Sequence, residues 1–556
     1  MKKSNQEDKK EESQSRVGRI RTAVTGTKQA VNTIRTFYAE KTAEAEVSDF
    51  SAEKLIEHAV ANHYFRFEHI GLTTIPEDIF ESKELRTELE VLYLQNNKIA
   101  SISPNISQLQ NLKCLDLSHN LISQLPVELY SLEHLVGLNL SSNKISHVSD
   151  KLFKMSNLQV LILNKNNLPT LSHKIEMLFE LTHLDIGSNN IKSLPDTICN
   201  LTNLKLLDVR DNYLKQLPHQ IYKLENLKGL YLQRNKIKKL PHVDPEDPES
   251  DISITRLVKL EDLDLSYNKL TNESLKGFGK LVKLKKIQLG RNCIDSIPED
   301  CSISDLMVLI DRVDLSRNCL SIFPCVLTLL CETLVHLDLR NNDLVSLSNQ
   351  IKFMINLKTL NVCHNSLTFL PQELSYCISL VKLEASHNLI RTMHPMCFSP
   401  NMTFLKEIIL DHNKILSIPD SITELPELMQ IKVSHNRLKA LPLEIHRIPF
   451  LYSIYASHNA ISSLPNNIGD CPRLRKLYLD YNSLSSVPES LTQVSTLQFL
   501  NLNYNLIPLP TKLEKTEVTQ QEEIIEMEEN IEQPVVRTMN DMLNLPHNEH
   551  VVCKLQ

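Results

Sequence analysis

Hydrophobic residues recur along this chain at fixed distances from an asparagine. The stretches that begin at Leu89, Leu112 and Leu135 read LEVLYLQNNKI, LKCLDLSHNLI and LVGLNLSSNKI. The alternating apolar residues before each asparagine predict a short β-strand whose leucines point into a core. The asparagine ends the strand, where its side-chain amide can bond the backbone of the turn and of the adjacent coil.

The same pattern covers most of the chain. Asparagines follow one another every 23 residues from Asn97 to Asn235 and continue with some wider spacings to Asn505, which makes 18 full repeats. A degenerate first unit, FRFEHIGLTTIP from Phe65, brings the total to roughly 19. One such unit cannot bury its apolar side alone, so the repeats must stack. The sequence therefore predicts an α/β solenoid, a horseshoe with a parallel β-sheet on its concave face.

Most repeats also carry a Leu-Pro pair between the asparagine and the next strand, as at Leu125-Pro126 and Leu194-Pro195. With the LxxLxLxxN core, this pair resembles the 23-residue "LP" type of intracellular leucine-rich-repeat proteins. Relatives of that type include the Ras-group and Ras-suppressor proteins and the repeat domains of Scribble and Erbin. The resemblance spans roughly residues 65–510. It implies a non-catalytic scaffold that binds proteins.

The repeat pattern also suggests how the chain is divided. We expect a disordered or basic leader over 1–50, an N-terminal cap with the degenerate first repeat over 51–88, and repeats over 89–510. An acidic, proline-containing insertion at 242–251 interrupts them, and the spacings drift after it. These two irregularities suggest the junction of two half-solenoids. Part of the acidic tail over 511–556 is expected to fold as a helical cap.

Composition narrows the functional classes. The net charge of −7 over 556 residues supplies no bulk electrostatic attraction for nucleic acid. The 12 cysteines are scattered singly, which indicates a reducing compartment and a cytoplasmic location. The polar N-terminus does not resemble a signal peptide, and no apolar run is long enough to span a bilayer. No catalytic constellation, cofactor motif or metal cluster stands out.

Histidine occupies the position just before the asparagine in five consecutive repeats. These residues, expected to form one column on the concave face, are His364, His387, His412, His435 and His458. Two interpretations stay open. The column is either a structural ladder, since this filling is common in the repeat family, or a pH-sensitive or metal-binding array.

The middle repeats place opposite charges on the same face. Asp264, Asp314 and Asp338 occupy mid-strand positions, and the candidate partner-binding residues Arg291, Arg317 and Arg340 lie among them. This interleaving predicts either mutual pairing or a charged recognition patch.

The last repeats are rich in tyrosine at positions expected to be exposed. In a chain with 14 tyrosines, this one surface is expected to carry Tyr452, Tyr455, Tyr478, Tyr481 and Tyr504. Tyrosine is favoured at interface hot spots because it combines a large rigid area with a polar tip. We predict partner binding here; the alternative is that some of these rings only cover the end of the solenoid.

The two ends suggest a membrane contact as an alternative role. Residues 16–38 form a basic amphipathic pattern, which suits an anionic membrane or a partner's groove, or a short leader helix. Cys553, followed by KLQ, partly matches a prenylation signal, although Lys554 is not aliphatic and no basic run precedes it. A single lipid would need a second signal for stable membrane attachment.

The sequence thus predicts a non-enzymatic intracellular scaffold, most simply a monomer, that binds proteins on its concave face. Signalling, or regulation of another enzyme through small-GTPase or phosphatase components, lies within this class. The string RVGRI at 16–20 lacks the aromatic residue of a phosphatase-docking motif, so that motif assigns no partner. The alternative is a membrane-attached adaptor anchored by Cys553 and the basic N-terminal segment.

Overall fold

The computed structural model describes residues 62–241, 253–276, 278–298, 309–492, 494 and 496–507. The predicted leader, the acidic insertion, the acidic tail and Cys553 lie outside these residues. The described chain divides into two compact units, one ending at Lys236 and the other beginning at Ile237. This division falls just before the acidic insertion, beside the predicted junction.

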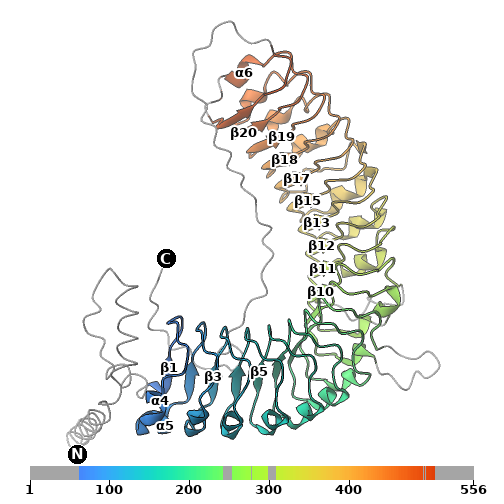
Figure 1. Ribbon diagram of the computed structural model, residues 1–556. Coiled ribbons are helices and arrows are strands. Elements are labelled where there is room, and N and C mark those ends of the chain that lie inside the picture. The colour runs from blue at the N-terminus through green and yellow to red at the C-terminus, as the bar shows by residue number, and fades with distance from the viewer. Residues whose placement is uncertain are drawn as a thin grey trace, which may run out of the picture. The chain divides into compact units, whose positions relative to one another are not determined.

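The first unit is built on eight parallel strands of three residues each, paired in sequence order and in step (Figure 1). They are β1 (Tyr64–Arg66), β2 (Val91–Tyr93), β3 (Cys114–Asp116), β4 (Gly137–Asn139), β5 (Val160–Ile162), β6 (His183–Asp185), β7 (Leu206–Asp208) and β8 (Gly229–Tyr231). β1 belongs to the degenerate first repeat, which therefore contributes a strand like the others.

The second unit has eleven such strands, again parallel and in step. They are β9 (Asp262–Asp264), β10 (Lys286–Gln288), β11 (Arg312–Asp314), β12 (His336–Asp338), β13 (Thr359–Asn361), β15 (Lys382–Glu384), β17 (Glu407–Ile409), β18 (Gln430–Lys432), β19 (Ser453–Tyr455), β20 (Lys476–Tyr478) and β21 (Phe499–Asn501). A separate two-stranded sheet pairs β14 (Phe369–Leu370) with β16 (Thr392–Met393). The nineteen main strands confirm the predicted solenoid and its number of repeats.

Short helices return the chain from one strand to the next. Most are 3₁₀ helices, and the α-helices that lie wholly within the described residues are α4 (Asp78–Glu81), α5 (Lys83–Glu88) and α6 (Glu489–Thr492). In the first unit the 3₁₀ helices are η2 (Pro104–Gln108), η3 (Val127–Ser131), η4 (Asp150–Lys154), η5 (His173–Met177), η6 (Asp196–Asn200) and η7 (Ile221–Lys223). In the second they are η8 (Ile254–Arg256), η9 (Asn272–Leu275), η10 (Phe278–Lys280), η12 (Cys325–Leu330), η13 (Asn349–Phe353), η14 (Gln372–Tyr376), η15 (Asp420–Glu424), η16 (Ile445–Arg447) and η17 (Ile468–Asp470).

The Leu-Pro pairs explain where many of these helices begin. Pro126 and Pro195 occupy the cap position before η3 and η6, both with φ of −69°, the angle to which the proline ring is restricted. Where proline is absent, serine often replaces it. The Ser149 hydroxyl, for example, accepts the Lys151 N–H of η4. The leucine before the proline is buried, as at Leu194 and Leu217, so each pair anchors the return segment to the core.

The core of each unit is aliphatic and continuous from repeat to repeat. Leu112, Leu115 and Leu117 of a single repeat are fully buried, and equivalent residues are buried along the stack. Complete burial of one such side chain contributes about 1.5–3 kcal/mol, so stacking supplies the stability that a single repeat lacks.

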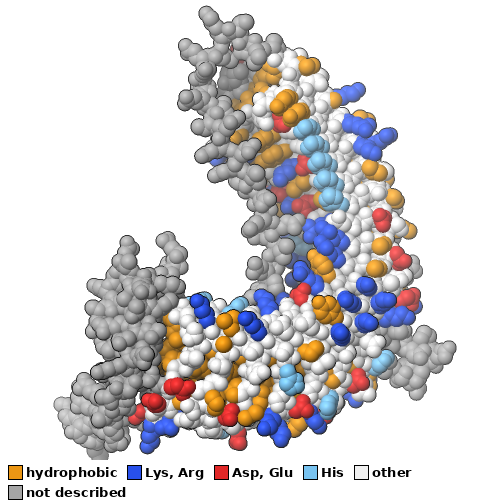
Figure 2. Space-filling model, in the orientation of Figure 1, with side chains coloured by type: hydrophobic (Ala, Val, Ile, Leu, Met, Phe, Trp, Pro, Cys, Tyr) orange, Lys and Arg blue, Asp and Glu red, His pale blue; other side chains and the backbone are white. Residues whose placement is uncertain are grey.

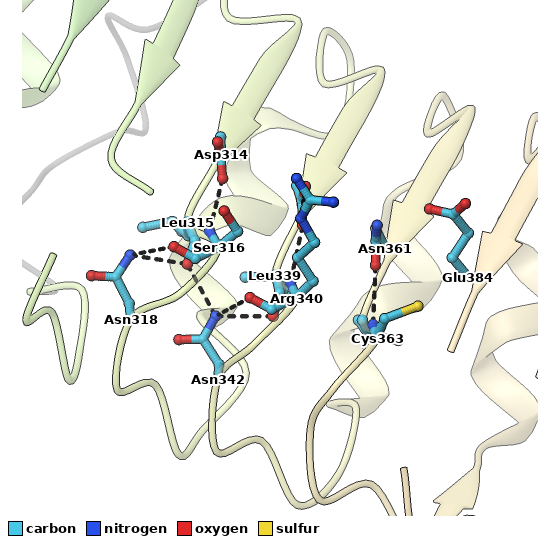
Figure 3. A network of polar contacts seen from close by, with 12 residues as sticks. Asp314, Leu315, Ser316, Asn318, Leu339, Arg340, Asn342, Asn361, Cys363 and Glu384 are labelled. Carbon is cyan, nitrogen blue, oxygen red and sulfur yellow. Dashed lines mark hydrogen bonds and ion pairs between the residues drawn. The ribbon is translucent and has the colours of Figure 1, made fainter. Parts of the chain in front are cut away.

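The repeated asparagine joins each repeat to the one before it (Figure 3). The Asn342 side-chain amide donates to the Leu339 carbonyl of its own repeat at 2.9 Å and to the Leu315 carbonyl of the preceding repeat at 3.0 Å. Its oxygen accepts the Leu320 N–H at 3.0 Å. All 18 asparagines accept a backbone N–H of the preceding repeat in this way. The predicted role of this residue is confirmed.

Replacing a ladder asparagine should therefore destabilise the protein far more than replacing an exposed one. Asn212→Ala leaves the Ile191 N–H and the Ile186 and Val209 carbonyls without this hydrogen-bond partner. We expect the free energy of unfolding to fall by about 2–4 kcal/mol. The measurement is equilibrium urea unfolding followed by circular dichroism.

The matched control is Asn203→Ala in the same repeat. Asn203 also donates to a carbonyl of the preceding repeat, that of Phe179 at 3.0 Å, but on the exposed side of the stack. Water can replace this bond, so the expected loss is about 1 kcal/mol or less. Equal losses in the two variants would contradict the role given to the buried ladder.

Candidate protein-binding surface

Side chains on the sheet face of the second unit are arranged in straight columns. The strands pair in step, so Lys432, Tyr455 and Tyr478 are direct neighbours on β18, β19 and β20. Neighbouring strands lie about 4.8 Å apart, so residues at equivalent repeat positions are held close enough to touch. One column lies four residues before the ladder asparagine, a second two before it, and a third one before it.

The third column has an unusual backbone. In all 18 repeats the residue before the ladder asparagine has a positive φ, between 51° and 58°. This left-handed conformation costs a non-glycine residue roughly 1–2 kcal/mol. The surrounding backbone hydrogen bonds hold it in place, as where the His412 N–H donates to the Ser434 carbonyl of the next repeat at 2.9 Å.

Seven consecutive members of this column carry aromatic rings that stack face to face. Each ring lies 4.2 Å from the next between centroids, with interplanar angles of 7–13°. We call this stack the ring column; its members are His364, His387, His412, His435, His458, Tyr481 and Tyr504. Figure 2 shows the histidines as a pale blue row on the second unit.

The ring column is open to solvent along its length. Stacking covers the ring faces, so the edges remain available, with their imidazole nitrogens and phenol hydroxyls. Desolvation first, and repulsion between neighbouring imidazolium ions second, lower the pKa values of His387, His412 and His435 below the usual 6.5. At neutral pH these three rings are therefore uncharged and offer both donors and acceptors.

Beside the ring column lie three pairs of a cation and an aromatic ring, which we call the cation–ring pairs. Lys432 Nζ lies 5.4 Å from the Tyr455 ring centroid, the Arg475 guanidinium carbon 5.5 Å from that of Tyr452, and Lys476 Nζ 5.5 Å from that of Phe499. Tyr455 and Tyr478 also stack on each other at 4.8 Å. These groups lie within about 6 Å of a ring, close enough for cation–π attraction.

Asp264, Asp314 and Asp338, which the sequence placed at mid-strand, are instead the last residues of β9, β11 and β12, where they have a structural task. The carboxylates of Asp264, Asp314 and Asp338 each accept the backbone N–H two residues further on, at 2.8–3.0 Å. Asp314 is drawn in Figure 3 with its bond to Ser316. Burial raises the pKa of Asp338 to about 6, and repulsion from Asp314 adds to this effect. These carboxylates stabilise the ends of the strands.

The three candidate arginines occupy two different columns. Arg291 and Arg317 precede ladder asparagines and are exposed, and Arg291 lies 4.4 Å from the centroid of the Tyr267 ring. Arg340 belongs to the neighbouring column, where its Nε lies 3.3 Å from a carboxylate oxygen of Asp338. Of the two predicted arrangements, Arg340 shows mutual pairing.

The five candidate tyrosines share the sheet face but lie in three columns. Tyr481 and Tyr504 end the ring column, Tyr455 and Tyr478 form the second stack, and Tyr452 immediately precedes β19. Their role in binding stays a prediction. Sequence reasoning missed Arg475, Lys476 and Phe499, although counting back from the ladder asparagine places Arg475 level with Tyr452 and Lys476 level with Phe499. It also missed that the histidines and tyrosines form one stack.

The described residues contain no group of three or more His, Cys, Asp or Glu side chains arranged to hold a metal ion. The five histidines stack as a ladder of rings, and a response of this column to pH stays a prediction. Among the same residues, no helix has the length and apolar character needed to cross a bilayer.

Removing one ring should change the titration of its neighbour. Because repulsion from His412 contributes to the lowered pKa of His435, His412→Asn should raise the pKa of His435 toward its ordinary value. Asparagine tolerates the left-handed backbone, so the fold is retained. Histidine ring signals followed by NMR across a pH series measure the shift. An unchanged His435 would contradict electrostatic coupling along the column.

Comparison with known proteins finds the same kind of repeat in this chain. A family model described as a leucine-rich repeat region matches residues 169–289. Models described as leucine-rich repeats match residues 87–145, 356–377 and 449–507. A search of curated protein sequences found no match.

Several solved structures share the fold. A leucine-rich-repeat protein of Leptospira interrogans is 26% identical over 82% of this chain and 94% of its own, with a TM-score of 0.57. The plant peptide hormone receptor RGFR1, in complex with RGF2, is 26% identical over 80% and 78%, with a TM-score of 0.57. YopM of Yersinia enterocolitica is 22% identical over 84% and 99%, with a TM-score of 0.54, which shows a common fold alone. Its repeats, its asparagine ladder and these matches show that the chain has the solenoid fold of leucine-rich-repeat proteins.

Proposed function

We propose that this protein is a non-enzymatic scaffold that binds other proteins on the sheet face of its second unit. The observation that carries the proposal is the exposed ring column, with the cation–ring pairs beside it. Tyrosine, phenylalanine and arginine at one exposed site are the side chains that dominate protein interfaces.

Rigidity supports a binding role for this face. The side chains stand on strands held by the asparagine ladder, and stacking restricts the rings further. A partner that docks here therefore loses little free energy in ordering the surface. RGFR1 shares the fold of this chain and is 26% identical over 80% of this chain. It is a peptide hormone receptor solved in complex with RGF2, and this likeness also supports a polypeptide ligand here.

The finer assignment follows the resemblance to the intracellular LP-type repeats. We place the protein in the cytoplasm as a monomeric scaffold in signalling or in the regulation of another enzyme, with small-GTPase or phosphatase components as partners. The free cysteines of the described residues support a reducing location, because Cys114, Cys199 and Cys377 act as buried core side chains.

Truncating the stacked tyrosine pair should weaken partner binding. The double variant Tyr455→Ala/Tyr478→Ala removes the ring that Lys432 lies over and its stacking neighbour. We expect recovery of direct partners in affinity purification from the native cell to fall at least tenfold, since hot-spot truncation costs 2 kcal/mol or more. Circular dichroism confirms that the variant is folded.

The matched control is Tyr376→Ala combined with Tyr213→Ala. Both tyrosines are about half exposed and lie outside the columns of the sheet face, Tyr376 at the end of η14 and Tyr213 just after a ladder asparagine. If the wild type and both double variants recovered the same amounts of partner, the proposed binding face would be contradicted.

The alternative role, a membrane-attached adaptor, depends on lipidation of Cys553. Mass spectrometry of the C-terminal peptide from the native cell tests it directly. A prenylated Cys553 with Lys554–Gln556 removed would establish the anchor, and Cys553→Ser should then move the protein out of the membrane fraction. A peptide that retains these residues and an unmodified cysteine would exclude it.

A further inference from the structure

We propose that an acidic segment of this same chain, residues 514–532, docks on the cation–ring pairs and on the adjoining end of the ring column. The segment would then compete with partners for the face. This inference rests on the proposed function only in taking that face as the binding surface.

The cations of the face lack acidic partners. No carboxylate oxygen of the described residues lies within 4.0 Å of Lys432, Arg475 or Lys476. Elsewhere on the same sheet face, exposed cations do find acids, as where Lys382 lies 2.6 Å from Glu384 and 3.6 Å from Glu407. Three cations held against rings without an acid form a site for carboxylates from elsewhere.

The acids nearest to these cations are already engaged. Asp411 accepts the Ser434 N–H at 2.7 Å, and burial raises its pKa to about 6. Asp480 accepts the Ser457 hydroxyl at 2.5 Å. Both aspartates lie two residues before a ladder asparagine. The charge of Lys432 lowers the pKa of Asp411 against the larger effect of burial, but no oxygen of Asp411 lies within 4.0 Å of Lys432 Nζ, so the two form no ion pair. The local charge of this patch is therefore positive although the whole chain is negative.

The patch also offers apolar area. The exposed fractions are 37% for Tyr452, 52% for Phe499 and 71% for Tyr504. A suitable occupant therefore combines several carboxylates with aliphatic side chains, which can pack on the rings while the carboxylates reach the cations.

Residues 514–532 have this composition. The sequence EKTEVTQQEEIIEMEENIE contains eight glutamates against one lysine, with Ile524, Ile525, Met527 and Ile531 among them. Six residues separate it from Ile507, the last described residue, and six extended residues span about 20 Å. The return from β21 to β18 crosses three strand spacings, about 14 Å. The segment is thus within reach, and its tethering gives it a high effective concentration at the face.

Zero-length carbodiimide cross-linking of the full chain tests the proposal, because it joins an amine to a carboxylate only where the two are in contact. We expect amide links from Lys432 and Lys476 to glutamates of residues 514–532, identified by peptide mass spectrometry in the monomer fraction. High salt, about 1 M, should remove most of them, since it shortens the screening length to about 3 Å.

Lys352 provides the internal control. Its ammonium also lies over an exposed ring, that of Phe353 at 5.2 Å, but on η13 rather than on the sheet face. Links from Lys432 and Lys476 should exceed those from Lys352 at least tenfold. Equal yields, links confined to the dimer fraction, or a segment linked only beside β21 would each overturn the proposal. Links confined to the dimer fraction would indicate docking of a second copy of the chain. A segment linked only beside β21 would indicate a simple end cap.

A binding measurement tests the proposal independently of cross-linking. A labelled peptide of residues 514–532 is titrated into the full chain and into a variant with Glu522, Glu523, Glu526, Glu528 and Glu529 changed to Gln. The peptide should bind the variant at least tenfold more tightly, because the face of the wild-type chain is already occupied. Equal affinities, or no binding to either protein, would refute self-docking while leaving partner binding, measured with the tyrosine variants, untouched.

Discussion

The side-chain amide of the repeated asparagine is the interaction on which this structure depends. Each repeat ends its strand with a turn whose N–H and carbonyl groups point into the stack, where water cannot reach them. A buried, unpaired backbone group costs about 1–3 kcal/mol, and a repeat holds several. The asparagine amide bonds these groups within its own repeat and in the preceding one. It therefore closes each turn and joins neighbouring repeats with the same atoms.

This joint also sets the surface. Because every asparagine bonds the preceding repeat in the same way, successive strands pair without slipping, and equivalent residues lie side by side. Side chains that would be scattered on another fold become columns here. Five histidines separated by some twenty residues each become one stack. Desolvation first, and repulsion between neighbouring rings second, lower the pKa values of its inner members. In the middle repeats the same geometry holds Asp314 beside Asp338, and repulsion from Asp314 adds to the burial that raises the pKa of Asp338.

The columns differ in what they leave available. The aspartates of the middle repeats accept backbone N–H groups at the ends of their strands, and Arg340 pairs with Asp338. Many of the charged groups in the middle repeats therefore already have partners. The last repeats present rings and cations that the described residues do not pair with acids. A partner, or an acidic part of the same chain, gains most by binding where polar groups are not already satisfied.

The sequence by itself determined the architecture, because one signature in a fixed register carries both the core leucines and the asparagine that joins the repeats. It also located the histidines, the tyrosines and the arginines on the correct face, since strand alternation decides which side chains leave the core. Only the tertiary structure decided how they interact. Whether Arg291 meets Tyr267 and whether the histidines continue into Tyr481 and Tyr504 depends on contacts between residues some two dozen positions apart. Whether Arg340 turns to Asp338, two residues before it, depends on the direction of its side chain. Such contacts follow from the in-step pairing of strands and from side-chain direction, and a linear pattern does not contain either.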